Sequence, residues 1–573
     1  MALDFSSSLS STQAHSSTLG PVDRTSFFEE QRRNRRATWR LATACGLAIL
    51  AMGIPLSIVL TPFVFTLALT VVHILDLILP LAALQGLMNV MSWVGAVLDY
   101  FLDGNGPQSS LASLFLAVGL VLLPGMGTVA ALWFSINSFF RHDGVGGILL
   151  SLGARTPRTE DLEEQQLTNL VTEMALAAGM PSPRVMLLDS PVANAAAVGS
   201  SPEDATIIVS RRVLDEFDRD ETQGIIGYLI GSIGNGDLRI AFLIGAVFLT
   251  FGLLTTLLNT PFGPQSRAIL RQLFELAFRR KQYGHGATEA ESLSRLLTRG
   301  LQMEGEDDLD TFTKKQEGRP LYFLLLPVLL TNLSIKMTLF VFISFLVGPL
   351  IALLWRSRCY LADATAVQLT RNPNGVARGL QGLANKGAMI PGSQWIAHLF
   401  IIGSETAKER GQAAFSSATK DFRQSGNTQL SPEESERLQK ALQQLRNGVT
   451  EAKTNTFEEA LGVGSFIGFR PPLTRRFERL RALGATTKTW HHVGLWERLM
   501  GMRKDLATLG PFKGALLVGM WLIVTILIPI AVIGLFVVVA MLTMISVMIM
   551  GFWLMAIYGS FSFLGFLIGL FFT

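Results

Sequence analysis

The sequence predicts a mostly α-helical membrane protein whose water-exposed part is an α+β domain, divided in sequence by a pair of transmembrane helices. The first observation is composition: 49% of the 573 residues are apolar and only 16% are charged, which is unusual for a soluble protein. The second is that apolar residues gather in runs near or above the roughly 20 residues with which a helix crosses a bilayer. These runs are residues 41–72, 111–139, 240–258, 321–355 and 514–573.

The alternation of apolar and polar segments divides the chain into six parts. They are a disordered basic tail (1–36), a transmembrane hairpin (37–140), the first part of the α+β domain (141–237), a transmembrane pair (238–355) with a polar loop (260–319), the second part of the domain (356–513), and C-terminal transmembrane helices (514–573). A further apolar run, 74–101, contains Asp76 and Asp99, so a buried or interfacial helix is the alternative there. The number of crossings in the C-terminal part stays open.

The distribution of Lys and Arg predicts the orientation in the membrane. Neither residue occurs between positions 41 and 140, whereas four arginines lie at 32–36 and Arg141 follows. Because positive residues are enriched on the cytoplasmic side, we expect the α+β domain to face the cytoplasm. The side of the 260–319 loop stays open, since its charges favour the cytoplasm but single crossings on both sides would place it outside.

Charge and cysteine content bear on two further classes of function. The net charge of +4 is spread over loops, without the basic surface and aromatic partners typical of nucleic-acid binding. We therefore expect no nucleic-acid partner. The two cysteines, Cys45 and Cys359, imply no disulfide framework. The sequence does not determine the oligomeric state.

Local patterns predict the elements of the first domain segment. An apolar pattern around Leu167 and Val171 indicates a helix that closes at Gly179, a residue suited to a helix C-terminus. Residues 184–188 and 205–210 have the composition of strands.

Two further helices have start signals. Asp220 and Gln223 have the spacing of a capping box, which predicts a helix through 224–237. In the second domain segment, Ser431 and the proline after it predict a helix that ends at Asn447.

Three stretches together resemble one protein family. They read GIIGYLIGSIGNGD (224–237), RCYLADATAVQLTRNP (358–373) and RPPLTRRFERL (470–480). In order and spacing they resemble the integral-membrane zinc metallopeptidases of the HtpX and CAAX prenyl protease type, over roughly residues 27–483. The resemblance implies a gluzincin-like domain, a multi-pass location in the bacterial inner (plasma) membrane, and membrane proteins or membrane-tethered peptides as the substrates of active relatives.

The residues at the family's zinc positions differ from those that the chemistry needs. The family's H-E-x-x-H supplies two histidine ligands and a glutamate base, and the resemblance places these positions at Tyr228, Leu229 and Ser232. The third ligand position is Cys359, and Arg470 replaces the histidine of the family's H-P-P element. Because a catalytic zinc site normally has three strong ligands and leucine takes no proton, we expect no catalytic residue, no bound metal and no cofactor.

Other family positions are kept. They are Asn194, Asn235, Gly236, Asp237, Asp363 and Arg476. In relatives the hairpin at 195–210 offers an edge strand to an extended peptide, a mode of binding that needs no metal. A purely structural role for the kept residues is the alternative, since buried charges with partners support folds as well as chemistry.

The remaining histidines do not rebuild a metal site by their spacing. His398 lies in the apolar stretch IAHLF, which is typical of a hydrogen-bonded core residue. On the replaced zinc helix, four glycines at positions 224, 227, 231 and 234 fall on one face, and small residues so placed let helices approach closely. Either the former cleft is filled by tight packing, or the site has drifted after loss of catalysis.

Three hypotheses for function follow. The first is a catalytically inactive member of the family, a pseudoprotease that binds or regulates membrane proteins or extended peptides. The second is an active membrane metalloendopeptidase with an altered site at Cys359. The third is a membrane assembly or transport component in which the charge-free segment 514–573 is the working part.

Overall fold

The computed structural model describes residues 26–47, most of 83–142, 152–259, most of 329–390, 398–403 and 469–486, with scattered positions elsewhere. Within these ranges the protein is mostly helical, with one small sheet. The expected loop 260–319, the helix at 431–447, His491, His492 and the C-terminal helices at 514–573 lie wholly or largely outside the described residues.

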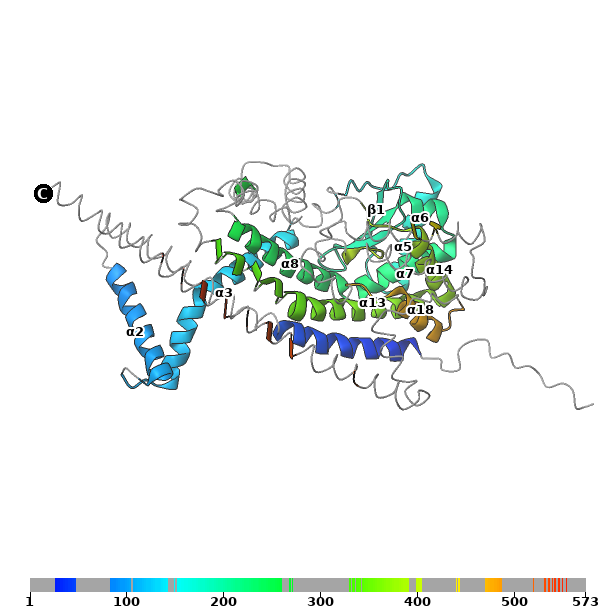
Figure 1. Cartoon of the computed structure of the whole chain (residues 1–573). Helices are drawn as coiled ribbons and strands as arrows, with labels where there is room; N and C mark the ends of the chain where they lie inside the picture. The colour runs from blue at the N-terminus through cyan, green and yellow to red at the C-terminus, as the bar shows by residue number, and fades with distance from the viewer. Residues whose placement is uncertain are drawn as a thin grey trace, which may run out of the picture.

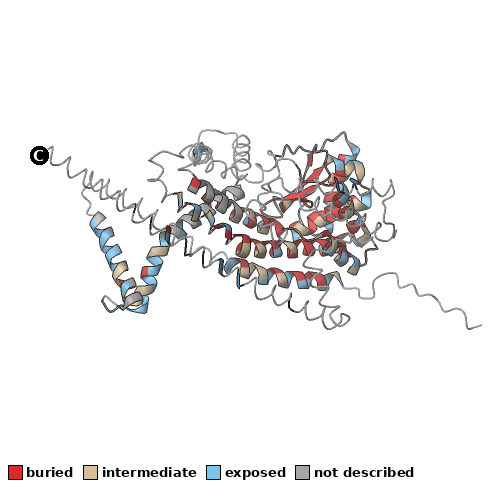
Figure 2. Ribbon diagram, viewed as in Figure 1, coloured by how far each residue is buried: buried red, intermediate tan, exposed pale blue. Residues whose placement is uncertain are grey.

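Two helices form a hairpin whose turn projects away from the domain, while the second of them packs against residues 237–259 (Figure 1). They are α2 (Ala83–Asp103) and α3 (Leu111–His142), and they meet through Val94, Val97 and Ala117. The turn between them follows Asp103. α2 falls largely within the apolar run 74–101, and most of the run 41–72 lies outside the described residues. Both helices expose large apolar side chains, and the ribbon of Figure 2 is pale blue at exposed residues.

Residues 27–47 form a helix that lies along α13 (Gly348–Thr370) in Figure 1. The amide of Gln31 donates to the Gln368 side-chain oxygen at 2.7 Å, and the hydroxyls of Thr38 and Ser357 are 3.1 Å apart. The expectation of a disordered tail up to residue 36 is therefore wrong for residues 27–36. Polar contacts hold the first half of this helix, up to Thr38, whereas Leu41, Ala42 and Cys45 join the apolar core. Hydrophobic periodicity therefore did not indicate residues 27–36.

The sheet has three strands, β1 (Arg184–Leu188), β2 (Ala195–Val198) and β3 (Thr206–Ser210), in the order β1-β3-β2. β1 pairs with β3 in parallel and β2 with β3 antiparallel. The two strands expected from composition are both present, and β2 lies beside β3 at the edge of the sheet. Its three alanines and Val198 are all buried.

The predicted helix before the sheet is α5 (Leu162–Ala177), and Asp161 caps its first turn. Gly179 follows with φ +66°, in the left-handed region where glycine carries no steric penalty. The short α6 (Arg211–Glu216) comes after the sheet. These elements belong to the first domain segment.

The helix at the family's zinc motif is α7 (Arg219–Gly234). Its capping box is formed by Asp218 and Glu221, two residues earlier than the predicted pair Asp220 and Gln223. Both pairs have the same spacing, and the side chain that reaches its backbone partner decides between them. α8 (Asp237–Asn259) follows after a bend of 75°.

The second domain segment packs against the first. It contains α13, α14 (Pro373–Lys386) and α18 (Leu473–Ala482). A buried core joins α5, the sheet and α7 to α14 and α18, and a second core gathers around α8 and α13, both red in Figure 2. The two segments that are separate in sequence thus form one domain.

One helix among the described residues, Asn332–Thr370, is long and apolar enough to cross a bilayer, with 39 residues. It includes the π-helical turn η1 (Ile343–Val347) and all of α13. The bent pair made of α7 and the first part of α8 passes the same test when counted as one span.

The glycine face of α7 is the surface on which the two domain segments meet. A methyl group added at Gly224 would lie 2.7 Å from the backbone of Gly375 and Val376 in α14, and one added at Gly227 would lie 2.8 Å from Thr370. At Gly231 it would lie 3.0 Å from Thr365 of α13. Real side chains do not approach so closely, so α7 reaches its neighbours because these positions carry no side chain.

We expect Gly224→Ala to destabilise the protein by about 2 kcal/mol, because overpacking against backbone cannot be relieved by a side-chain movement. Gly234→Ala is the matched control, since its methyl group would lie 3.9 Å from the Met180 sulfur and alanine favours helix by up to about 1 kcal/mol. Thermal unfolding of the detergent-purified chain measures both. Equal unfolding midpoints for the two variants would show that the Gly224 contact is not tight.

A network of charges holds the N-terminus of α5 to the sheet. Glu164 is fully buried and accepts hydrogen bonds from Arg155 at 2.7 and 3.0 Å and from the Arg158 amide at 2.6 Å. The Arg155 hydrogen bonds lower the pKa of Glu164 from 4.5 to about 2, against the opposing effect of burial.

The lowered pKa of Glu164 predicts an acid-dependent loss of stability. Because its folded-state pKa lies below the unfolded value, the stabilisation is complete above about pH 4.5 and is lost as the pH falls towards about 2. The free energy of unfolding should therefore drop more steeply over this window in the wild type than in Glu164→Gln. Glu163→Gln, which alters a half-exposed neighbour, should keep the wild-type slope; the idea fails if Glu164→Gln keeps it too.

Candidate functional site

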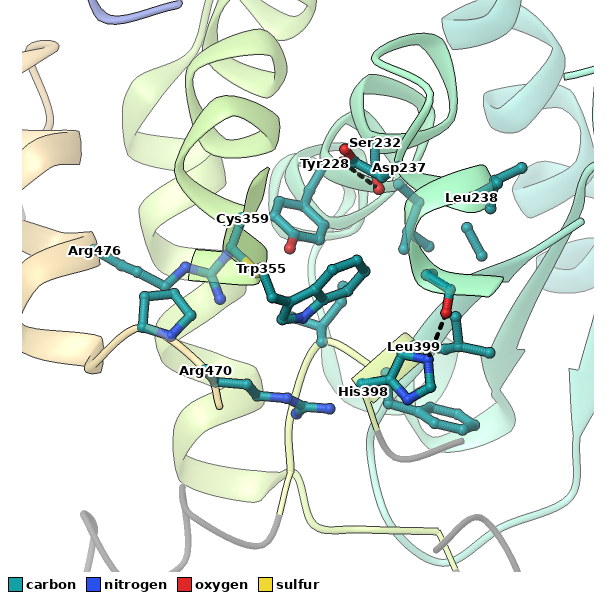
Figure 3. A pocket seen from close by; sticks show the side chains of 16 residues that line it. Tyr228, Ser232, Asp237, Leu238, Trp355, Cys359, His398, Leu399, Arg470 and Arg476 are labelled. Carbon is teal, nitrogen blue, oxygen red and sulfur yellow. Dashed lines mark hydrogen bonds between the residues drawn. The ribbon is translucent and has the colours of Figure 1, made fainter. Parts of the chain in front are cut away.

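The positions that the resemblance assigned to the zinc site lie around one pocket. α7, α13 and the start of α8 form its walls, and segments 398–401 and 470–476 close it. The labelled side chains in Figure 3 include Tyr228, Ser232, Asp237, Cys359, Arg470 and Arg476. Residues far apart in the sequence are thus brought together as the resemblance predicted.

α7 presents Tyr228 and Ser232 to the pocket, because residues four apart lie on the same face of a helix. The Ser232 hydroxyl donates to an Asp237 carboxylate oxygen at 2.8 Å. Leu229, at the base position, also lines the pocket and is 2% exposed. None of the three offers the imidazole or carboxylate that a metallopeptidase uses.

Asp237 is held by a buried ion pair with Arg358 of α13. Arg358 also donates to the backbone oxygen of Asn235, and the Asn235 amide donates to Thr365 at 3.0 Å. Gly236 has φ +81°, which permits the bend into α8. These kept residues together hold the α7–α8 turn against α13.

A second buried ion pair joins Asp363 of α13 to Arg476 of α18. It is bidentate, with distances of 2.6 and 2.9 Å. The Arg476 guanidinium also lies over the Tyr228 ring, 5.0 Å from its centroid, within the range of a cation–π contact. Arg476 therefore positions the aromatic ring that occupies the first family histidine position.

Cys359 is buried in the pocket wall at 7% exposure and interacts with the Tyr228 hydroxyl. The neighbouring Arg358, which could in principle activate a thiolate, directs its guanidinium to Asp237 instead. The geometry corresponds to a buried thiol in a packed wall and gives no activating partner from Arg358.

The far side of the pocket is formed by Arg470 and the segment that contains His398. A methyl group at Gly403 would lie 2.8 Å from the Arg470 guanidinium carbon, so this arginine packs directly on backbone. His398 Nε2 lies 3.2 Å from the Ala241 oxygen, and its ring meets Trp355 edge-on at 5.9 Å. His398 is thus a buried, hydrogen-bonded residue, as its apolar context predicted.

The outer edge of β2 is paired with the chain's own segment 400–401. The Ile401 amide donates to the Ala195 oxygen at 2.9 Å, and Ala196 and Phe400 form an antiparallel bridge. The Asn194 side chain donates to the oxygens of Ala388 and Ile402 and accepts from the Ile402 amide. The edge that we expected to be offered to a peptide is therefore occupied along this stretch.

The residues at the family's metal positions do not fit a zinc ion. Within the part of the chain that the structure describes, no three His, Cys, Asp or Glu side chains form a group that could hold a metal. Asp237 and Asp363, the carboxylates nearest the pocket, are already paired with arginines. The free volume of the pocket is about 20 Å³, and a cavity needs about 10–15 Å³ of such volume to hold one water molecule.

Sequence reasoning did not indicate Trp355, Phe400 or the pairing of Arg358 with Asp237. Their contributions depend on the crossing of helices and on a loop that returns to the sheet. An arginine one residue before the third ligand position was a visible signal, but its direction could not be read from spacing.

A comparison with protein families matches Peptidase family M48 to residues 161–483, more than half of the chain. The chain belongs to peptidase family M48. The match spans both domain segments and includes Tyr228, Cys359 and Arg470. The HtpX-type resemblance is thereby confirmed at the level of the family.

Relatives of the M48 chain are similar to it over part of their length. "Protease HtpX homolog" of Streptococcus uberis is 28% identical over 226 residues, which is 39% of this chain and 58% of the relative. The homologue of Streptococcus gordonii is 27% identical over 52% of this chain and 78% of its own length, and that of Listeria innocua 27% over 46% and 71%. The aligned part thus spans somewhat more than half of the S. uberis protein. No solved structure matches the chain.

The Asp363–Arg476 pair predicts a large coupling between α13 and α18, which both belong to the second domain segment. We expect Arg476→Met to destabilise the protein by about 3–5 kcal/mol, because it leaves a buried carboxylate without its partner. The double variant Asp363→Leu, Arg476→Met should recover much of this loss. Unfolding midpoints of the two single variants and the double variant give the coupling, and additive losses would contradict it.

Proposed function

We propose that this M48 protein is a catalytically inactive, membrane-embedded member of its family that binds or regulates membrane-protein partners. The observation that carries the proposal is the convergence of Tyr228, Leu229, Ser232 and Cys359 on one pocket. The fold brings the former metal positions together, yet the side chains there have a different chemistry. A pocket of this kind keeps the architecture of a protease without its reaction.

The side chains at these positions are unsuited both to holding the metal and to acting as the general base. Zinc binds thiolate, imidazole and carboxylate, and of the four positions only Cys359 offers one of these groups. A tyrosine ligand would have to lose a proton whose ordinary pKa is about 10. Leu229 cannot accept a proton from water, so the general-base step of hydrolysis has no group to perform it.

The pairing at β2 supports extended peptides as partners. Segment 400–402 satisfies backbone groups of β2 and both ends of the Asn194 amide. A peptide strand presents the same alternating donors and acceptors. An extended partner would take the place of this segment at β2 and Asn194.

Exposed apolar side chains support placement in the membrane. Phe115 is 75% exposed, Leu123 65% and Phe134 68%, all on α3. Soluble proteins rarely expose such a concentration of large apolar groups, and Asn332–Thr370 has the length and composition of a spanning helix. In the proposed multi-pass arrangement, the domain formed by the two M48 segments faces the cytoplasm.

The metal content of the purified protein tests the proposed function. We expect no stoichiometric zinc in the wild type, and about one zinc per chain in a variant with Tyr228→His, Leu229→Glu, Ser232→His and Cys359→Glu, because these changes restore the family's ligands and base. Elemental analysis of the detergent-purified full chain is the measurement. Hydrolysis of casein by the two proteins is the second readout.

Two comparisons keep this test decisive. Thermal unfolding of the restored variant shows whether it is folded, and a variant lacking only the Leu229→Glu change should bind zinc without hydrolysing casein. One zinc per chain in the wild type, or casein hydrolysis that Cys359→Ala abolishes, would overturn the proposal in favour of an active enzyme with an altered site.

A further inference from the structure

The helix at residues 27–47 has one face that is used by the fold. Gln31, Asn34 and Thr38 are buried on it. They contact α13 and α18, the latter through Arg479, which donates to Glu30 at 2.7 Å and to Asn34 at 3.1 Å. This face accounts for the position of the helix in Figure 1.

The opposite face carries a stripe of basic and aromatic side chains. Its members, at spacing i, i+3, i+4, i+7 and i+8, are Arg32, Arg35, Arg36, Trp39 and Arg40. This spacing places them along one side of a helix, and all five are exposed, with Trp39 at 75%. We call these five residues the arginine stripe.

The stripe has little compensating charge. Arg33, outside the stripe, pairs with Glu30 at 2.8 Å, and Glu30 is also held by Arg479. Between the described residues no ion pair is found for Arg32, Arg35, Arg36 or Arg40. Of the two acidic residues in this helix, Glu30 is buried, and Glu29, three positions before Arg32, is exposed.

The location of the stripe indicates the kind of surface it meets. The helix runs antiparallel to α13, since Gln31 contacts Gln368 and Thr38 contacts Ser357. Moving along it from the stripe therefore leads towards the apolar part of Asn332–Thr370, and the apolar run 41–72 begins directly after Arg40. The four arginines and a tryptophan thus stand where a polar helix face passes into an apolar segment.

We propose that the arginine stripe binds the phosphate groups of anionic phospholipids at the membrane surface. Guanidinium groups form paired hydrogen bonds with phosphate oxygens, and tryptophan is enriched at the level of lipid headgroups. The inference rests on the proposed membrane placement, and is independent of whether the M48 pocket is active. Lipid bound at this face would favour the folded state, in which the helix packs on α13 and α18, and would so stabilise the domain.

The test uses the full chain in detergent and its thermal unfolding midpoint as phosphatidylglycerol is added to the micelles. A ligand that binds the folded state raises the midpoint. The test variant changes Arg32, Arg35, Arg36 and Arg40 to Gln. The control variant has the same loss of charge, because it changes four exposed arginines of the M48 domain to Gln: Arg158, Arg184, Arg219 and Arg371.

We expect phosphatidylglycerol to stabilise the wild type and the control variant alike, with an apparent affinity at least about tenfold weaker in the stripe variant, since each basic residue near an anionic surface contributes. The effect should weaken with added salt and be absent with phosphatidylcholine. Changing the four arginines to Lys should retain most of it. Arg35→Gln alone should give a partial loss, which keeps the test valid if the fourfold variant is poorly folded.

Each other outcome overturns the proposal. Equal affinity in the stripe and control variants would assign the lipid effect to another surface. Equal stabilisation by glycerol phosphate would indicate a free-phosphate site, and stripe-dependent binding of polyglutamate or duplex DNA without a phosphatidylglycerol effect would indicate another class of partner. The zinc content of the same samples is a separate readout, so failure here is distinguishable from failure of the pseudoprotease proposal.

Discussion

The close approach of α7 to α13 and α14 is the constraint on which the rest of the structure depends. It is possible because Gly224, Gly227 and Gly231 carry no side chains where the neighbouring helices pass. The approach joins a segment that precedes the apolar pair to one that follows it. It also fixes the distance at which Tyr228 and Ser232 face Cys359, so the pocket is a consequence of helix packing.

Buried charge pairs complete this arrangement. Asp237 with Arg358 ties the α7–α8 turn to α13, and Asp363 with Arg476 ties α13 to α18. Burying two opposite charges costs desolvation free energy, which their attraction offsets only when the geometry is good. These pairs therefore restrict how far the helices can shift. They also pair the carboxylates nearest the pocket with arginines. The pocket itself is lined by the Tyr228 ring, the Ser232 hydroxyl and the Cys359 thiol. The kept family positions thus have a structural role that does not require a metal.

Two further segments form hydrogen bonds with polar groups on the surface of this core. The segment at residues 400–402 satisfies the edge of β2 and the Asn194 amide, and the helix at residues 27–47 satisfies polar groups of α13 and α18. Each contact covers a surface that would otherwise meet water or a partner. The face of the N-terminal helix that remains uncovered is the one with the arginines.

Sequence by itself determined the helix α5, the strands β1 and β3, and the family to which the chain belongs, because periodicity, capping residues and motif order are properties of neighbouring positions. It also identified which residues would share a site. It did not determine which acidic residue caps α7, that residues 27–36 are helical, or that β2 is already paired. The last two of these features depend on contacts between residues hundreds of positions apart, such as Gln31 with Gln368 and Asn194 with Ile402. Only the tertiary structure decided them, because spacing along a chain does not specify the direction in which a polar side chain finds its partner.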